Sequence, residues 1–155
     1  MTPAIDLLVK HNITHQVHEY KHDPACQAYG LEAAEKIGVE IGLVFKTLVV
    51  KLDGKQLAVA IIPVADKLSL KAIAKACKAK KAVMAEAIEV QRSSGYVLGG
   101  VSPLAQKRQL LTIIDNSCAQ LVQMYVSGGR RGLDIEIAPT DLQQLLNADI
   151  TSITA

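Results

Sequence analysis

The feature that most constrains the fold is a pair of apolar segments, Leu43–Leu52 and Gln56–Pro63, joined by the dipeptide Asp53-Gly54. Asp-Gly between two such segments is typical of a β-hairpin. Further strands are predicted at His15–Tyr20, Tyr96–Leu98, Leu110–Asp115, Leu121–Val126 and Leu133–Ile137. Because several strands follow one another without a helix between them, a regular βαβ alternation does not fit. The sequence therefore predicts a mixed α/β fold, with a curved or barrel-like β-sheet surrounded by helices.

Helices are predicted where capping residues precede amphipathic segments. Their expected bounds are Thr2-Pro3 to Asn12, Glu32 to Ile37 with Gly38 as the stop, Ser69 to Cys77 or Lys78, Glu86 to Arg92, and Thr140 to Leu145 or Leu146. Thr140 followed by Gln143 matches a capping box. A chain of 155 residues without a linker or repeat fits a single domain over residues 1–155.

Composition narrows the class of protein. Half of the residues are apolar and 21% are charged, which is typical of a globular chain. No apolar run approaches the roughly 20 residues that cross a bilayer, and no export signal follows Met1, so no membrane contact is expected. Cys26, Cys77 and Cys118 are scattered, which favours a reducing compartment. We expect a cytoplasmic protein.

Charge says little about nucleic acid, because the net charge is only +2. Basic residues nevertheless gather locally, at Lys71, Lys75, Lys78, Lys80 and Lys81, at Lys107-Arg108 and at Arg130-Arg131. Such patches can neutralise a few phosphates. On charge alone, solvated helix and loop surfaces are the better interpretation.

A metal site is not expected, although His11, His15, His18 and His22 are closely spaced. Asn12-Ile13-Thr14 interrupts them as a helix-to-strand turn, so one helical face cannot present all four. No cofactor is expected either, because neither GxxxxGK[ST] nor GxGxxG occurs between a strand and a helix. The nucleophile motif GxSxG is also absent, and Cys77 and Cys118 fit structural thiols better than nucleophiles.

Lys46 is the most informative residue. Side chains alternate between the faces of a strand, and Lys46 shares its face with Val44, Leu48, Val50 and Leu52. An ammonium group on an aliphatic face must reach water, find a carbonyl or anionic partner, or line a cavity. The residues alone leave an edge strand in water and a functional site equally open.

Two glycine-rich segments are the next candidates. Gly99-Gly100-Val101-Ser102-Pro103 can bring backbone amides close to a ligand oxygen, and Pro103 stiffens it. Ser127-Gly128-Gly129-Arg130-Arg131-Gly132 adds two guanidinium groups suited to phosphate or carboxylate. Each segment alone is better explained as a connecting turn, but both in one small chain raise the probability of a site.

In combination these motifs resemble the YbaK family, and within it the Cys-tRNA(Pro) deacylases. The resemblance rests on Thr2-Pro3-Ala4, Phe45-Lys46-Thr47-Leu48, Gly95-Tyr96, the Gly99–Pro103 segment and Ser127 to Asp134, in order along the chain. It implies an enzyme that cleaves the ester between a mischarged amino acid and the 3′ end of tRNA. For cysteine it implies substrate-assisted chemistry, in which the thiol attacks its own ester and leaves as a thiolactone.

The resemblance also implies roles for single residues. Lys46 would anchor the tRNA terminus, and Gly100, Val101, Ser102 and Pro103 would form a Gly-x-x-Pro loop whose backbone amides contact the aminoacyl carbonyl. Pocket residues would be Tyr20, Thr47, Gly99, Ser127, Gly129 and Asp134. Asp134 alternates onto the face of Glu136, opposite Leu133, Ile135 and Ile137, so it can face a polar cavity.

Two residues depart from the family pattern: Ala105 stands where glycine is usual, and Tyr29 where phenylalanine is common.

The implied partners are aminoacyl-tRNA and, for the choice of tRNA, prolyl-tRNA synthetase. Two alternatives stay open: a non-catalytic module that binds tRNA ends or a nucleotide, and a deacylase for another mischarged tRNA, such as Ala-tRNA(Pro). The second would need water as nucleophile, because alanine has no thiol.

Overall fold

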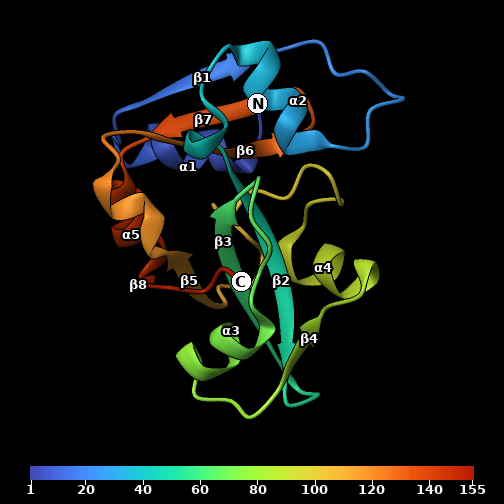
Figure 1. Cartoon of the computed structure of the whole chain (residues 1–155). Helices are drawn as coiled ribbons and strands as arrows, with labels where there is room; N and C mark the ends of the chain where they lie inside the picture. Colours follow the sequence, from blue (N-terminus) through green and yellow to red (C-terminus); the bar gives the residue numbers. More distant parts are fainter.

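The computed structural model describes residues 1–155 and contains five α-helices and two β-sheets (Figure 1). The helices are α1 (Pro3–Lys10), α2 (Tyr29–Ile37), α3 (Leu70–Ala76), α4 (Ala87–Ser94) and α5 (Pro139–Leu146). The strands are β1 (His15–Glu19), β2 (Phe45–Leu52), β3 (Gln56–Pro63), β4 (Ala82–Met84), β5 (Leu111–Asp115), β6 (Met124–Arg130), β7 (Leu133–Ile137) and β8 (Asp149–Thr151). Short 3-10 turns cover Ile41–Leu43 and Asn116–Gln120.

The predicted hairpin is confirmed and forms the centre of the larger sheet. β2 and β3 pair antiparallel with Phe45 opposite Pro63 and Leu52 opposite Gln56. The larger sheet has the order β4-β2-β3-β5-β8, in which β3–β5 and β5–β8 are parallel pairs. The smaller sheet has the antiparallel order β1-β7-β6. The predicted mixed α/β fold is therefore confirmed.

The sheets do not close into a barrel. They are joined by an isolated parallel bridge between Val44, just before β2, and Tyr125 in β6. The barrel-like sheet expected from the sequence is instead two open sheets, with the smaller one across one end of the larger one (Figure 1), and the two share a core. That core takes Val49 and Ile61 from the larger sheet and Val126 and Ile135 from the smaller one.

Strand β2 is covered on both faces. Phe45 and Val49 belong to the shared core, whereas Val50 and Leu52 pack into a second cluster beneath α3 with Ile73. Burial on both faces explains why the β2 sequence is apolar almost throughout. Lys46 pairs with Ile62 of β3, whereas β4 pairs with β2 only at Val50–Leu52, so one edge of β2 has no strand beside it at Lys46.

Several predicted boundaries were wrong. Tyr96–Leu98 is a loop, because Gly95 ends α4 in the left-handed region (φ 83°) and the Tyr96 hydroxyl donates to the carbonyl oxygen of Leu104 at 2.7 Å. The strand expected at Leu121–Val126 instead runs over Met124–Arg130 and takes in most of the second glycine-rich segment.

Helix starts were also misplaced at two positions. α5 begins at Pro139 with Ala138 as its N-cap, so the capping box predicted at Thr140 does not form. α2 begins at Tyr29, three residues before Glu32. Strands β4 and β8 were not predicted, because each has only three residues and neither shows a strong alternating pattern.

Candidate active site

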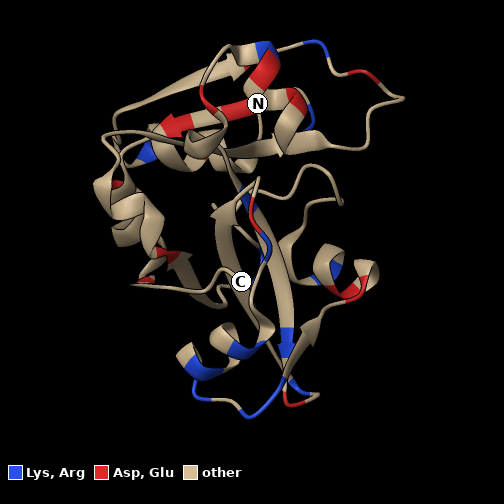
Figure 2. Ribbon diagram, in the orientation of Figure 1, with Lys and Arg blue, Asp and Glu red and all other residues tan.

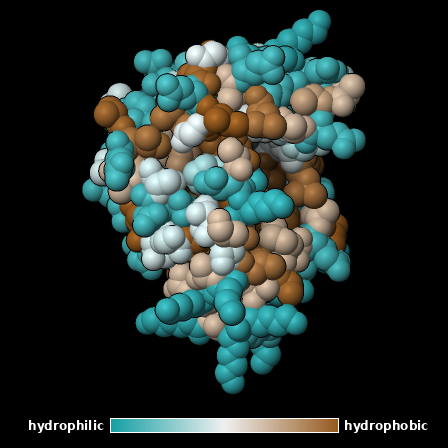
Figure 3. Space-filling model, in the orientation of Figure 1, coloured by the Kyte–Doolittle hydropathy of each residue, from teal (hydrophilic) through white to brown (hydrophobic).

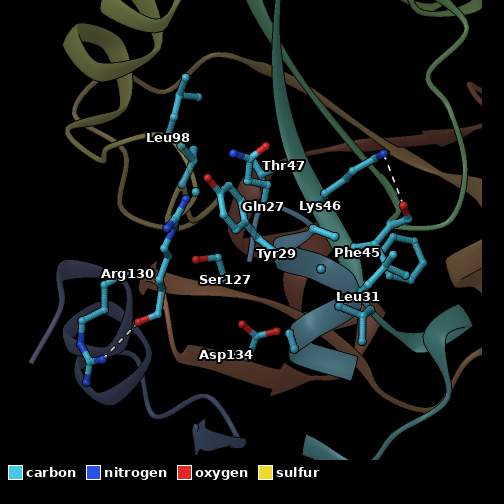
Figure 4. A pocket seen from close by; sticks show the side chains of 18 of the residues that line it. Gln27, Tyr29, Leu31, Phe45, Lys46, Thr47, Leu98, Ser127, Arg130 and Asp134 are labelled. Atoms are coloured by element: carbon cyan, nitrogen blue, oxygen red, sulfur yellow. Dashed lines mark hydrogen bonds between the residues drawn. The ribbon is translucent and has the colours of Figure 1, made fainter. Parts of the chain in front are cut away.

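A pocket of about 540 Å³ lies where the two sheets meet. Its walls come from the start of β2, the N-terminal part of α2, the loop that follows α4, and the β6–β7 hairpin (Figure 4). Eleven of its twenty lining residues are hydrophobic. Figure 3 shows a recess bordered by apolar side chains at this level of the molecule. A concave, mostly apolar cavity with a few polar groups is the usual form of a ligand site.

Lys46 lies in this pocket and not in open solvent. Its side chain is half-buried, and Nζ donates one long hydrogen bond, 3.4 Å, to the carbonyl oxygen of Val64 (Figure 4). No carboxylate pairs with this ammonium group. Because an ammonium group has three N–H donors, it retains the capacity to bind an anionic or carbonyl oxygen.

The Gly99–Pro103 loop reaches the same pocket through Gly99 and Val101. The Gly100 amide donates to the carbonyl oxygen of Val97 at 3.0 Å, whereas the amides of Val101 and Ser102 make no backbone hydrogen bond. The Gly99 amide makes none either, so Gly99, Val101 and Ser102 carry the free donors of the loop, and of these three residues Gly99 and Val101 line the pocket. Gly100, Ser102 and Pro103 are buried behind the lining and do not themselves face the pocket.

Gly100 holds the loop against the β6–β7 turn. A Cβ added at Gly100 would lie 2.7 Å from the Cα of Arg130, so only glycine allows this approach of two backbones. The two adjacent glycines predicted a close approach of the backbone to a ligand. The close approach exists, but at Gly100 it is to the backbone of the protein itself. Gly129 also lies outside the pocket, where it packs against Tyr96 and Thr2.

Asp134 supplies a buried carboxyl group. It stands opposite Ser127 in the β6–β7 pair, and both residues line the pocket. Leu133, Ile135 and Ile137 point into the shared core, which confirms the predicted alternation. Burial raises the pKa of Asp134 to about 7, and the nearby His18 opposes that rise electrostatically.

Thr47 and Tyr20 complete the polar lining predicted from the sequence. The Thr47 hydroxyl is buried and has no hydrogen-bond partner. A buried hydroxyl without a partner is costly, so its retention beside a cavity is typical of a group that binds a ligand. Burial, with a further contribution from the Asp134 charge, raises the pKa of Tyr20 to about 12, so its hydroxyl stays protonated.

The role of Arg131 was not predicted beyond its charge. Its guanidinium carbon lies 3.6 Å from the centroid of the Tyr29 ring, and Nη1 lies 2.7 Å from Nε2 of His22. Since arginine only donates, His22 must accept through Nε2 and donate through Nδ1 to Oε1 of Glu32, 2.7 Å away. Hydrogen bonds to His22 and to the amide of Asp23 lower the pKa of Glu32 to about 2.

This chain of contacts fixes one wall of the pocket. A Cβ added at Gly99 would lie 2.6 Å from Nε of Arg131, so the guanidinium group is enclosed between the loop and Tyr29. Tyr29 was singled out only for its hydroxyl. A planar cation stacked on an aromatic ring is a common stabilising contact, but sequence spacing gives no signal for it. His22 and His18, which pairs with Glu136 at 2.8 Å, are thus engaged with acidic partners.

The pocket can therefore hold a small apolar group against its walls while donors meet an oxygen-rich group at its edge. It brings together Tyr20, Lys46, Thr47, Gly99, Val101, Ser127 and Asp134 of the predicted site residues. The free amide of Val101 and the Lys46 ammonium group are suited to a developing negative charge on a carbonyl oxygen. No helix of the structure has the length and apolar character needed to span a membrane.

Comparison with known proteins gives a consistent result. A family model described as an aminoacyl-tRNA editing domain matches residues 24–145. EbsC of Enterococcus faecalis, which carries the name Cys-tRNA(Pro)/Cys-tRNA(Cys) deacylase, is 33% identical over 153 residues, covering 99% of this chain and 93% of that protein.

Two crystal structures share the fold. Hypothetical protein APE2540 has a TM-score of 0.89 at 22% identity, covering 99% of this chain and 100% of that one. A protein described as a trans-editing enzyme for prolyl-tRNA synthetase has a TM-score of 0.83 at 21% identity, covering 98% and 92%. At these identities the two structures support the architecture alone.

Proposed function

This chain belongs to the aminoacyl-tRNA editing family of deacylases, and from that premise we propose that it removes cysteine from mischarged Cys-tRNA(Pro). The observation that supports this most directly is Lys46, an ammonium group without a carboxylate partner at the edge of an apolar pocket. Such a group favours an anionic terminus or a charged transition state over a neutral ligand. Cys-tRNA(Cys) is a second substrate of the same chemistry.

We propose that the substrate supplies its own nucleophile. The cysteine sulfur attacks the carbonyl carbon of its ester, a C–S bond forms, and the bond from that carbon to the ribose oxygen breaks. The thiol proton ends on the ribose hydroxyl group, and cysteine leaves as a cyclic thiolactone. Intramolecular attack needs mainly correct orientation, which agrees with a pocket that has no serine–histidine pair.

Each residue then has a defined task in that step. The Val101 amide donates to the carbonyl oxygen as negative charge develops on it, and Lys46 holds the RNA terminus nearby. In this proposal the Thr47 hydroxyl and the Asp134 carboxyl group, which both line the pocket, orient the α-amino group and side chain of cysteine. No metal or cofactor is needed for this chemistry.

Release of labelled cysteine from Cys-tRNA(Pro) tests the proposal, with Lys46→Ala as the variant and Lys51→Ala as its control. Lys51 lies on the same strand but pairs with Glu89 outside the pocket. We expect the control to keep its activity and Lys46→Ala to lose about 100-fold in kcat/KM. Equal activity of the two variants would remove Lys46 from the mechanism, and a wild type that binds tRNA without releasing cysteine would make the chain a binding module.

Comparing Cys-tRNA(Pro) with Ser-tRNA(Pro) and Ala-tRNA(Pro) tests the thiol mechanism. A thiol nucleophile predicts rapid release of cysteine only. Equal rates for all three would require water as the nucleophile and would favour the broader deacylase.

We further propose that prolyl-tRNA synthetase selects the tRNA in the cytoplasm, because the pocket itself contacts only the aminoacylated tip. Tight, selective binding of one tRNA by the isolated protein would contradict that division of tasks.

A further inference from the structure

Six exposed lysines gather at the end of the molecule opposite the smaller sheet. This lysine end comprises Lys55 in the β2–β3 turn, Lys71 and Lys75 on α3, and Lys78, Lys80 and Lys81 before β4 (Figure 2). Figure 3 shows hydrophilic side chains projecting from the lower edge of the molecule, where this end lies. The deacylase chemistry proposed above uses none of them.

The lysine end carries charge that the protein does not neutralise. None of its six ammonium groups takes part in an ion pair. Asp53 lies among them, but its carboxylate accepts hydrogen bonds from the backbone amides of Lys80 and Lys81. The whole chain has a net charge of +2, so without these six lysines it would be −4. The positive charge is thus concentrated at one end of an otherwise acidic molecule.

Strand β2 relates this end to the pocket. Lys46 and Thr47 line the pocket near its start, and Leu52 at its other end leads into the turn that holds Lys55. Leu52 also pairs with Ala82, which places Lys80 and Lys81 beside the same turn. At about 3.3 Å per residue, the separation is about 20 Å. A nucleic-acid strand carries one phosphate per about 3.4 Å of helix axis, so this span corresponds to about six nucleotides.

We infer that the lysine end binds the sugar-phosphate backbone of the tRNA acceptor arm, several nucleotides from the aminoacylated tip in the pocket. The inference rests on the proposed function, since it assumes that a tRNA 3′ end occupies the pocket. Unpaired lysines on flexible stems bind phosphates as point charges and do not read sequence. The contact therefore adds affinity for tRNA in general. With it, the protein recognises the acceptor arm of the RNA as well as the aminoacyl ester.

The experiment compares a long and a short substrate. Lys71→Ala/Lys75→Ala and Lys80→Ala/Lys81→Ala each remove two charges from the lysine end. Lys10→Ala/Arg92→Ala removes two exposed, unpaired charges from α1 and α4 and serves as the matched control. The long substrate is Cys-tRNA(Pro), and the short one is cysteine esterified to the trinucleotide CCA, which cannot reach the lysine end.

Both lysine-end variants should raise KM for Cys-tRNA(Pro) about 5- to 10-fold at 0.1 M salt, with kcat and the rate on the short ester unchanged. The slope of log(kcat/KM) against log[salt] should become shallower by about 1.5, as expected for two lost phosphate contacts. The control variant should match the wild type. Alanine favours helix, so the α3 variant should keep its fold, which circular dichroism verifies.

Other outcomes overturn the inference. Lysine-end variants that behave like the control would show that no phosphate is bound there. An equal loss on both substrates would assign these lysines to the pocket or to stability. A loss that appears only when prolyl-tRNA synthetase is added would make the lysine end a surface for an acidic protein. If the wild type cleaves neither ester, the proposed function fails, and the salt slope for binding deacylated tRNA still decides the inference.

Discussion

Replacing Gly100 with alanine tests whether the position of the Gly99–Pro103 loop controls catalysis. The added Cβ would lie 2.7 Å from Cα and 3.1 Å from the carbonyl carbon of Arg130. Both atoms belong to the backbone, so neither can rotate away. Ordinary contact begins at 3.4 Å, and the two segments must therefore separate by about 0.7 Å. The φ of Gly100 is not positive, so the alanine itself adds no backbone strain.

The expected cost follows from that displacement. Overpacking of this kind lowers the free energy of unfolding by about 1–3 kcal/mol. A shift approaching 1 Å in groups that must meet a carbonyl oxygen lowers the rate by about 10- to 100-fold. Gly42→Ala is the matched control, because its Cβ would meet nothing within 4 Å and its φ is not positive.

Two measurements decide the outcome: urea unfolding of both variants, and kcat/KM for release of cysteine from Cys-tRNA(Pro). We expect Gly100→Ala to lose both stability and activity, and Gly42→Ala to lose little of either. A Gly100→Ala protein that is destabilised but fully active would show that the loop amides do not take part in the reaction. An unchanged stability would refute the steric reasoning itself.

Three further substitutions should change the stability of the protein, or its dependence on pH, in different directions. Thr47→Val removes the unpartnered hydroxyl, so urea unfolding should show a gain of about 1 kcal/mol, while KM for Cys-tRNA(Pro) rises. Asp134→Asn should remove a fall in stability: the folded pKa of about 7 exceeds the ordinary 3.8, so Asp134 lowers wild-type stability by up to about 4 kcal/mol as pH rises from 4 to 7, and the variant should not show this fall in chemical denaturation. Ala105→Gly relieves a left-handed alanine (φ 56°) and should raise the free energy of unfolding by about 0.5–1 kcal/mol, measured as a higher urea midpoint.

Local patterns predicted the parts of the fold that depend on neighbouring residues. The β2–β3 hairpin follows from two apolar segments around Asp53-Gly54, and the position of Asp134 on the face opposite Leu133, Ile135 and Ile137 follows from alternation along β7. Lys46 could be singled out because a single cation interrupts an aliphatic face. Ala105, noted as a departure from glycine, proves to stand at a positive φ, which gives that departure a structural meaning.

The parts that failed depend on partners far along the chain. Tyr96–Leu98 has strand-forming residues, but the Tyr96 hydroxyl binds Leu104 and keeps the segment as a loop. The connection between the two sheets is the Val44–Tyr125 bridge, which joins residues 81 positions apart. In the site, the stacking of Arg131 on Tyr29 and its contact with His22 have no local signature, because three separate segments supply them.

The contact between the two glycine-rich segments has a consequence for the history of the sequence. Gly99 faces Arg131 and Gly100 faces Arg130, so two consecutive residues of one segment meet two consecutive residues of the other. Selection therefore acts on the four positions jointly. A bulkier residue in either segment fits only if the backbone or side chain of the opposite segment has first moved away. Among descendants of a common ancestor, such positions should covary, and a chimaera that exchanges one segment without the other should be less fit than either parent.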